Sequence, residues 1–443
     1  MTTPICDFIR AYTEKATIRL HMPGHKGVGE IEKWDITEID GADSLYEACG
    51  IIAESEKNAG ELFGADTFYS AEGSSLCIRA MLYLTALYAK KKGERPRVAA
   101  GRNAHKSFLS AVSLLDIEVD FLTGEGASYL SCPLSAKEIA IYLDGATVRP
   151  TAIYLTSPDY LGNTVDIEGI ARACHDRGVL LLVDNAHGAY LKFLPKSRHP
   201  MDLGADVCCD SAHKTLHALT GAAYLHVAKS APAVFCERAK QALALFGSTS
   251  PSYLILASLD ALNLRLAVGY PAALTAHLNT LAAMKDRLTD EGYTLVGDEP
   301  MKLTIHAKSY GYTGREMANY LTANGFVHEF ADPDFLVLMP SPDLDKAMLA
   351  RLTETLIALP KKEARRDTAP ALSRPERVCS PREAMLAPGE RVPATKAEGR
   401  VLAAITVGCP PAVPIVVSGE RIDADAVSAF AYYGVTDCLV IKE

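Results

Sequence analysis

Short apolar segments alternate with segments of helical pattern from about residue 54 to residue 227, and this alternation is the strongest constraint on the fold. The apolar segments include Ile153–Thr156, Val179–Val183 and Asp206–Cys209, and a long helical pattern runs from Leu76 to Lys90. Strands separated by helices pair in parallel, because each crossover helix returns the chain to the same end of the sheet. We therefore expect an α/β protein with a mainly parallel central sheet covered by helices.

The 443 residues are enough for two or three domains. A helical stretch from Ala257 to Thr289 leads into a smaller α/β segment, and a charged stretch with several prolines begins after Pro360. We expect an N-terminal arm, a large domain, a small α/β domain with its connecting helix, a linker and a C-terminal module. The expected boundaries are 1–50, 51–256, 257–360, 361–380 and 381–443.

Composition excludes several classes of protein. The 45 basic and 54 acidic residues give a net charge of −9, which argues against nucleic-acid binding. The 11 cysteines form no C-x-x-C pair, so neither a disulfide framework nor a zinc knuckle is expected. No apolar run of about 18 residues occurs, so no membrane span is expected. These features favour an ordinary globular protein of the cytoplasm, and the acidic balance is compatible with cationic small substrates.

Two predicted strands end in residues that suit pyridoxal phosphate (PLP). Asp184 ends the apolar strand Leu180–Val183, and Ser211-Ala212-His213-Lys214 follows the next one. A lysine can hold PLP as a Schiff base, and a carboxylate can keep the ring nitrogen protonated. Because ligands bind at the carboxyl ends of strands in open α/β sheets, both residues are expected in one site. Asp184 could instead cap the following helix.

A phosphate site is predicted where Gly73-Ser74-Ser75 opens a helix. Exposed amides, the helix dipole and two hydroxyls suit an anion, although a serine at this position is often only an N-cap. Ser211 and His213 could also donate to a phosphate. His187 could orient the ring, and His105 could stack on a cofactor or cap a helix. The pair His213 and His217 has no accompanying third ligand, so no metal is expected.

Five motifs resemble the PLP-dependent ornithine/lysine/arginine decarboxylases of the aspartate-aminotransferase fold, and the resemblance covers nearly the whole chain. The segments are His21-Met22-Pro23-Gly24-His25-Lys26-Gly27, Thr37-Glu38-Ile39-Asp40-Gly41-Ala42-Asp43, Arg102-Asn103-Ala104-His105-Lys106-Ser107, Asp184-Asn185-Ala186-His187-Gly188-Ala189 and Ser211-Ala212-His213-Lys214. The resemblance implies that His105 stacks on PLP and that Lys214 carries it. It also implies that the segment around Thr249 reaches the partner's phosphate, in a homodimer with shared active sites.

The expected reaction is α-decarboxylation of a basic amino acid, with Lys214, His213 and Asp184 as catalytic residues. The distal cation of the substrate needs a carboxylate, and the candidates are Asp43, Asp159 and Glu420. Three departures from the family's motifs leave the substrate open. Asn185 stands where Glu is usual, Asp159-Tyr160-Leu161 replaces T-Y-Y or T-Y-D, and Cys409 lies where P-Y-P-P-G has its Tyr.

Two other functions stay open. A PLP-dependent aminotransferase or β-eliminating lyase would use the same cofactor residues, and Arg315 or Arg351 could hold the α-carboxylate of its substrate. A PLP-fold protein without catalytic activity could serve as a regulatory partner. Retention of both Lys214 and Asp184 argues against the second alternative.

Overall fold

The protein was analysed as a computed structural model that describes residues 1–372, 375–405 and 413–443. Its chain divides into two compact units. The first unit contains Met1–Val98, Ile139–Leu155 and Ile167–Ala272, and the second contains Ala99–Glu138, Thr156–Asp166 and Ala273–Glu443. Each unit is therefore assembled from three separate stretches of the chain. The five ranges expected from the sequence stay a prediction.

The main sheet has seven strands in the order β1-β7-β6-β5-β4-β2-β3. β5 pairs in parallel with β6, whereas β7 is antiparallel to both of its neighbours, β6 and β1. β1, β5 and β6 therefore point in the same direction. The strands are β1 (Asp66–Ser70), β2 (Arg97–Gly101), β3 (Glu118–Leu122), β4 (Ala152–Thr156), β5 (Leu180–Asp184), β6 (Val207–Asp210) and β7 (Ala223–Val227).

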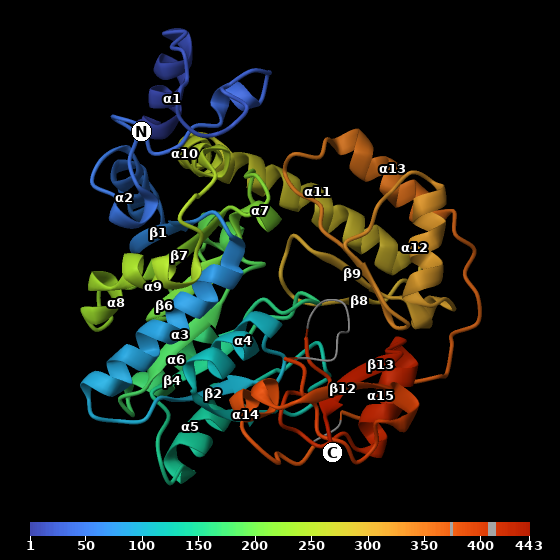
Figure 1. Cartoon of the computed structure of the whole chain (residues 1–443). Helices are drawn as coiled ribbons and strands as arrows, with labels where there is room; N and C mark the ends of the chain where they lie inside the picture. The colour runs from blue at the N-terminus through green and yellow to red at the C-terminus, as the bar shows by residue number, and fades with distance from the viewer. Residues whose placement is uncertain (373–374, 406–412) are drawn as a thin grey trace. The chain divides into compact units, whose positions relative to one another are not determined.

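Strands β5, β6 and β7 are buried along their whole length, as expected for strands covered on both faces. Helix α3 (Gly73–Lys91) packs against β1, β6 and β7, and α6 (Ile167–His175) packs against β5 (Figure 1). The expected α/β architecture is confirmed. The other helices of the first unit are α1 (Pro4–Glu14), α2 (Ile51–Phe63), α5 (Ala136–Gly145, which begins in the second unit), α7 (Ala212–Thr215), α8 (Val234–Glu237), α9 (Ala239–Phe246) and α10 (Tyr253–Ala267).

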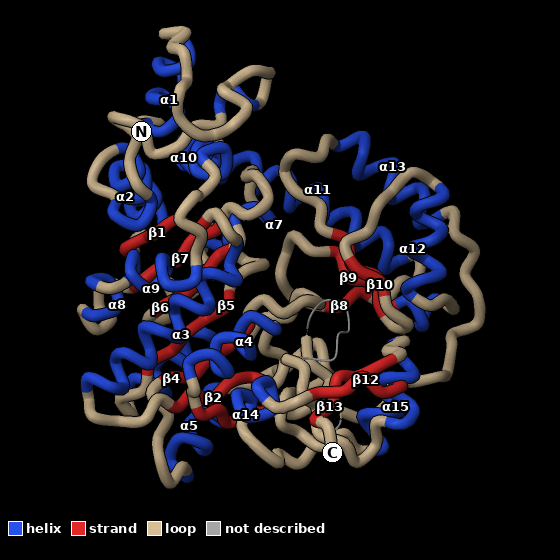
Figure 2. Tube along the Cα trace, viewed as in Figure 1, coloured by secondary structure: helices blue, strands red, loops and turns tan. Residues whose placement is uncertain are grey.

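The second unit contains an antiparallel sheet in the order β10-β11-β9-β8. Leu303, Ile305 and Leu336 of this sheet pack with Leu321 and Leu356 of two helices in one apolar core. Figure 2 shows these short strands in red and their helices in blue. The elements are β8 (Leu295–Val296), β9 (Leu303–His306), β10 (Phe330–Ala331), β11 (Phe335–Leu338), α4 (Lys106–Leu115), α11 (Tyr270–Asp290), α12 (Gly314–Ala323) and α13 (Lys346–Ile357).

The last part of the second unit contains a two-stranded antiparallel sheet of β12 (Gly389–Pro393) and β13 (Asp437–Ile441). Helix α15 (Ala424–Tyr433) contributes Phe430 to a core with Val416 and Val440, and α14 (Pro381–Leu386) packs against α4. Short 3₁₀ helices complete the chain at Glu32–Trp34, Leu45–Glu47, Ala189–Phe193, Ala307–Tyr310 and Ala394–Lys396.

The helical stretch expected from Ala257 to Thr289 is wrong as one element, because it is two helices, α10 and α11. Gly269 breaks the stretch with φ +90°, a backbone conformation that glycine adopts at little cost, and Pro271 follows in the first turn of α11. Among the described residues, no single helix is long and apolar enough to cross a membrane. The two helices meet that criterion only together, and they are bent by 78° at the break.

Candidate active site

Asp184 is the last residue of β5, and its side chain is 3% exposed. Its carboxylate accepts hydrogen bonds from the Tyr154 hydroxyl and the Ala186 backbone N–H, both at 3.2 Å. Burial raises the pKa of Asp184, while the ammonium of Lys214 acts in the opposite direction. Because burial disfavours the negative charge of Asp184, a cationic group such as a pyridinium would bind favourably beside it.

Lys214 lies on α7, the single helical turn that follows β6. Its Nζ is 3.1 Å from Nε2 of His187, which is itself buried. The Lys214 side chain is exposed. The reason is local, because β6 ends at Asp210 and α7 lies beyond the buried part of the strand. The contact nevertheless joins the ends of two parallel strands at one edge of the sheet.

The predicted phosphate site lies where α3 begins. Gly73, the first residue of the helix, has φ +72°, and a Cβ built on it would meet no atom closer than His213 Cε1 at 4.0 Å. The Ser211 hydroxyl donates to the Ser74 hydroxyl at 2.8 Å, so β6 and α3 are joined at this point. Ser75 follows in the first turn and is half-buried. An open, glycine-lined helix N-terminus with nearby hydroxyls suits a phosphate group.

His213 is half-buried and its Nδ1 lies 2.9 Å from the carbonyl oxygen of Ala222. Burial lowers the pKa of His213, so the ring is neutral at physiological pH. In the neutral form with a proton on Nδ1, the ring donates to this carbonyl and keeps Nε2 as an acceptor. The first unit therefore brings together seven of the predicted residues: Gly73, Ser74, Ser75, Asp184, His187, Ser211 and Lys214, with His213 beside them.

His105 lies in the second unit, where it is the N-cap of α4 and accepts a hydrogen bond from the Ser107 backbone N–H at 3.2 Å. The capping role that the sequence left open is therefore present, and stacking on PLP stays a prediction. Thr249 lies in an exposed segment between α9 and α10. Its contact with a partner subunit also stays a prediction.

Asp43, a candidate for substrate binding, is surrounded by its own backbone. Its two carboxylate oxygens accept N–H groups from Ser44, Cys49, Gly50 and Ile52 at 2.8–3.0 Å. Burial opposes ionisation, but these backbone hydrogen bonds hold the pKa of Asp43 below its ordinary value. In this structure the carboxylate holds the loop that leads into α2.

Asp159 and Glu420 are also hydrogen-bonded within the second unit. Asp159 accepts from the backbone N–H and the side-chain amide of Asn163, both at 2.9 Å, and burial raises the pKa of Asp159. Glu420 forms a buried ion pair with Arg102 at 2.8 Å and accepts from the Val417 N–H. Substrate binding by these carboxylates stays a prediction. Cys409, the remaining departure from the family motifs, lies outside the described residues.

The sequence analysis missed Tyr154, whose hydroxyl contacts Asp184 from β4. The sequence gives little indication of a role for Tyr154, because a tyrosine in an apolar strand is common in protein cores. It also missed the buried polar cluster behind the strand ends, made of His199, Asp210 and His226. No spacing rule connects these three residues, since they come from a loop and two strands.

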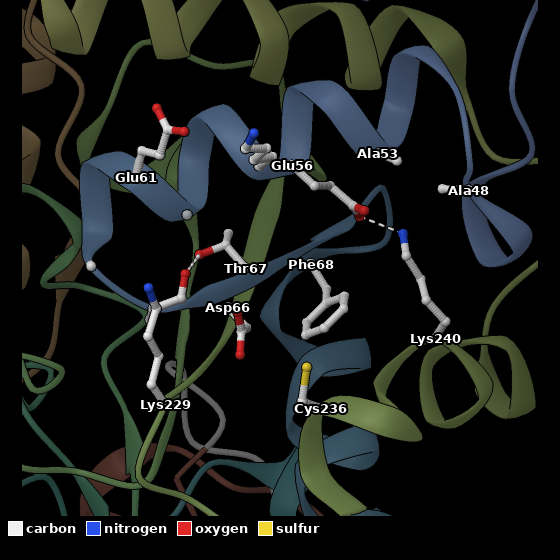
Figure 3. Close-up of a pocket in the computed structure, with 14 residues that line it drawn as sticks. Ala48, Ala53, Glu56, Glu61, Asp66, Thr67, Phe68, Lys229, Cys236 and Lys240 are labelled. Carbon is white, nitrogen blue, oxygen red and sulfur yellow. Dashed lines mark hydrogen bonds and ion pairs between the residues drawn. The ribbon is translucent and has the colours of Figure 1, made fainter. Parts of the chain in front are cut away.

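A separate cavity of about 580 Å³ lies between α2, β1 and the segment 229–240 (Figure 3), and none of the predicted site residues lines it. Glu56 and Lys240 form an ion pair at its wall. Burial raises the pKa of Glu56, and the Lys240 ammonium acts against that shift. The cavity is therefore distinct from the strand-end site.

Comparison with known proteins agrees with the fold and identifies the family. The family model for the Orn/Lys/Arg decarboxylase major domain matches residues 3–270, and the model for the C-terminal domain of that family matches residues 365–438. The chain belongs to the Orn/Lys/Arg decarboxylase family. The predictions of the family and of an amino-acid decarboxylase are thereby confirmed.

Relatives within the Orn/Lys/Arg decarboxylase family cover almost the whole chain. The arginine decarboxylase of Bacillus subtilis is 29% identical over 96% of this chain and 92% of its own length, and that of Halalkalibacterium halodurans is 29% identical over 95% and 91%. The lysine decarboxylase of Francisella novicida has 16% identity and a TM-score of 0.79 over 99% of this chain and 81% of its own. The constitutive lysine decarboxylase of Escherichia coli has 18% identity and a TM-score of 0.77, over 100% and 82%. These likenesses confirm the predicted fold.

Proposed function

We propose that the protein is a PLP-dependent decarboxylase that removes the α-carboxylate of a basic amino acid as CO2. The observation that carries the proposal is the meeting of two strand ends. The Lys214 ammonium lowers the pKa of the buried Asp184 carboxylate at the end of β5, against the effect of burial. Lys214 also contacts the buried His187. A nucleophilic amine and a buried acid at one sheet edge are the two groups that PLP requires from a protein.

The residues of the first unit fit PLP at both of its ends. Asp184 would hold a proton on the ring nitrogen, and Lys214 would hold the cofactor through Nζ. The phosphate would lie at the start of α3, against Gly73, Ser74 and Ser75, with Ser211 as a further donor. When bound, PLP supplies a cationic ring that accepts the electron pair of the bond that breaks.

The side chains of the protein would exclude water and transfer protons during the reaction. Because a carboxylate loses its charge as CO2 leaves, a site that excludes water favours the reaction. Lys214 Nζ and His187 Nε2, 3.1 Å apart, are within proton-transfer distance of one another. Lys214 or His213 would return a proton to the α-carbon. Because the His213 ring is neutral and its Nε2 is an acceptor, His213 would first take up a proton from water at Nε2 and then donate it.

The alternative activities lack comparable support. Arg315 donates to the Tyr433 carbonyl at 3.1 Å and Arg351 to the Asn324 carbonyl at 2.6 Å, so both candidate carboxylate clamps are engaged within the second unit. A regulatory protein without activity has no need for a lysine opposite a buried carboxylate. We therefore favour decarboxylation over transamination, β-elimination and a purely regulatory role.

We propose arginine as the first substrate to test, because the Bacillus subtilis and Halalkalibacterium halodurans relatives are named arginine decarboxylases. We also propose a cytoplasmic homodimer in which the exposed segment around Thr249 reaches the partner's PLP phosphate. A substrate amino acid with a distal cation would meet a carboxylate, for which Asp43, Asp159 and Glu420 remain the candidates.

Visible absorbance after incubation with PLP and gel filtration tests the cofactor assignment. The wild type should retain a band near the visible edge, and Lys214→Ala should lose it. The matched control is Lys229→Ala, an exposed lysine of the same unit that lines the separate cavity. Retention of the band in Lys214→Ala, or its absence from the wild type, would overturn the proposed role.

A further inference from the structure

A second connection joins the strand ends behind Asp184 and Lys214. The side-chain amide of Asn185, the residue after Asp184, donates to Oδ1 of Asp210, the last residue of β6, at 2.6 Å. Both side chains are 0% exposed. The backbone N–H of Asn185 also donates to the Cys209 carbonyl at 3.0 Å, which continues the pairing of β5 and β6 beyond the strand. Asn185 thus joins the two strand ends through one backbone and one side-chain hydrogen bond.

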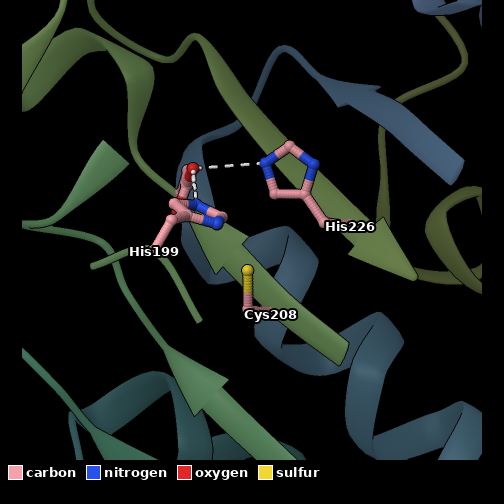
Figure 4. A group of neighbouring side chains, drawn as sticks. His199, Cys208 and His226 are labelled. Carbon is pink, nitrogen blue, oxygen red and sulfur yellow. Dashed lines mark hydrogen bonds and ion pairs between the residues drawn. The ribbon is translucent and has the colours of Figure 1, made fainter. Parts of the chain in front are cut away.

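The other oxygen of Asp210 faces two imidazoles (Figure 4). Oδ2 lies 2.9 Å from His199 Nε2 and 3.2 Å from His226 Nε2, and both rings are completely buried. Burial alone would raise the pKa of Asp210, but these two imidazoles hold that pKa below its ordinary value. Asp210 is therefore a buried carboxylate with donors on both oxygens, and Asn185 supplies the donor that faces the active site.

The same cluster also contains Cys208, and its four potential ligand atoms lie within 4.8 Å of one another. Hydrogen bonding explains the geometry better than a metal does. His199 Nδ1 accepts the Met201 backbone N–H at 3.3 Å, so Nε2 is the ring nitrogen that donates to Asp210 and is not available to bind a metal. Burial raises the pKa of the Cys208 thiol, which disfavours the thiolate that a metal would require.

The orientation of Asn185 shows which of its atoms matters. Its Nδ2 is bonded to Asp210, whereas its buried Oδ1 has no hydrogen-bond partner among the described residues. A buried carbonyl without a partner costs about 1–3 kcal/mol. An asparagine at this position is therefore useful as a neutral donor, despite its unsatisfied oxygen. The residue that departs from the family motif thus complements the carboxylate of Asp210.

We propose that Asn185 and Asp210 are a positioning pair that sets the distance between Asp184, which would hold the PLP ring nitrogen, and the Ser211–Lys214 segment, which would hold the other end of the cofactor. The inference rests on the proposed function. Asn185 is one residue from Asp184, and Asp210 directly precedes Ser211. A displacement of either side chain moves one of these two anchors against the other.

The most direct test exchanges the carboxylate and the amide between positions 185 and 210. Asn185→Asp places two carboxylates in contact, so the strand ends separate or one carboxyl must take up a proton. Adding Asp210→Asn restores the pattern, because the new amide at position 210 can donate to the carboxylate at 185 and accept from both imidazoles. Asn185→Asp should weaken PLP binding by about tenfold or more, and the double variant should recover most of the loss.

The effect of pH distinguishes charge repulsion from simple loss of packing. In Asn185→Asp the shared proton raises a carboxyl pKa, so the defect should be small in acid and should grow as pH rises through that value. His199 and His226 are paired with Asp210, and burial raises the pKa of the other titratable groups that interact with it. These other groups are Cys77, Cys208, Cys209 and Tyr224. The matched control is Leu181→Val, a buried change in β5 that lowers stability without touching the pair.

The measurements are thermal unfolding of the protein without PLP and the Kd for PLP by visible absorbance, at about pH 6 and about pH 8. The proposal expects pH-dependent loss in Asn185→Asp, rescue by the second substitution, and a PLP Kd in Leu181→Val close to that of the wild type. Equal PLP affinity in Asn185→Asp and wild type would overturn it, as would a double variant no better than the single one. If the wild type itself binds no PLP, the proposed function fails and the positioning role fails with it, whatever the unfolding data show.

Discussion

Lys214 Nζ lies 3.1 Å from His187 Nε2, and this contact joins the segment after β6 to the segment after β5. His187 is buried while Lys214 is exposed, so the ring is the fixed member of the pair. An imidazole in this place can hold the lysine in one position and share its proton.

His187→Ala should therefore lower kcat on the order of a hundredfold and change the pH profile of kcat. The physical reason is loss of the group that holds and exchanges a proton with Lys214. Steady-state CO2 release across a pH series measures both effects. A His187→Ala enzyme with a lower kcat but an unchanged pH profile would count against proton sharing.

Asp184→Asn should separate activity from stability. The amide cannot hold the PLP ring nitrogen in its charged state, so kcat/KM should fall by about a hundredfold or more. Burial raises the pKa of Asp184, so the ionised carboxylate is disfavoured in the folded protein. The free energy of unfolding of the wild type therefore falls as pH rises above 3.8, the pKa of the unfolded state. Without PLP, the Tm of Asp184→Asn at neutral pH should therefore be no lower than that of the wild type. A large fall in this Tm would show that the carboxylate is mainly a structural group.

Ser211→Ala should weaken PLP binding by about tenfold, because a phosphate would lose a hydroxyl donor and Ser74 would lose its partner. The PLP Kd by visible absorbance is the measurement. Ser428→Ala is the control, since Ser428 is an exposed helical serine bonded to its own helix. Equal Kd values for the two variants would remove Ser211 from the phosphate site.

Asp43→Asn should lower the free energy of unfolding by about 1–3 kcal/mol, because a carboxylate that accepts several backbone N–H groups is replaced. These bonds hold the pKa of Asp43 below its ordinary value, so its stabilisation is complete above 3.8 and is lost as pH falls through the lower folded value. Urea unfolding should show a constant difference at neutral pH that shrinks in acid. A raised KM for the substrate with unchanged stability would instead place Asp43 in the substrate site.

The sequence was most informative where local pattern and chemistry coincide. Apolar strands followed by polar residues located Asp184 and Lys214, and family motifs supported the same positions. Two features could not be predicted from the sequence pattern, namely the exposure of Lys214 and the break in the expected helical stretch 257–289. The exposure of Lys214 depends on where β6 leaves the core, and the break at Gly269 depends on a single backbone conformation inside an otherwise continuous helical pattern.

The polar network behind the site could not be predicted. His199, Asp210 and His226 are brought together by a loop and by the pairing of β6 with β7, and none of these contacts leaves a recognisable spacing in the chain. The structural use of Asp43 is hidden for the same reason, because its partners are backbone groups up to ten residues away.

Mass spectrometry of the PLP-loaded protein incubated separately with arginine, lysine and ornithine tests the central claim most directly. The account predicts that at least one of these amino acids is converted to its amine with loss of CO2, and that Lys214→Ala abolishes the conversion while Lys229→Ala does not. Formation of a keto acid in place of an amine, or turnover that persists in Lys214→Ala, would contradict it.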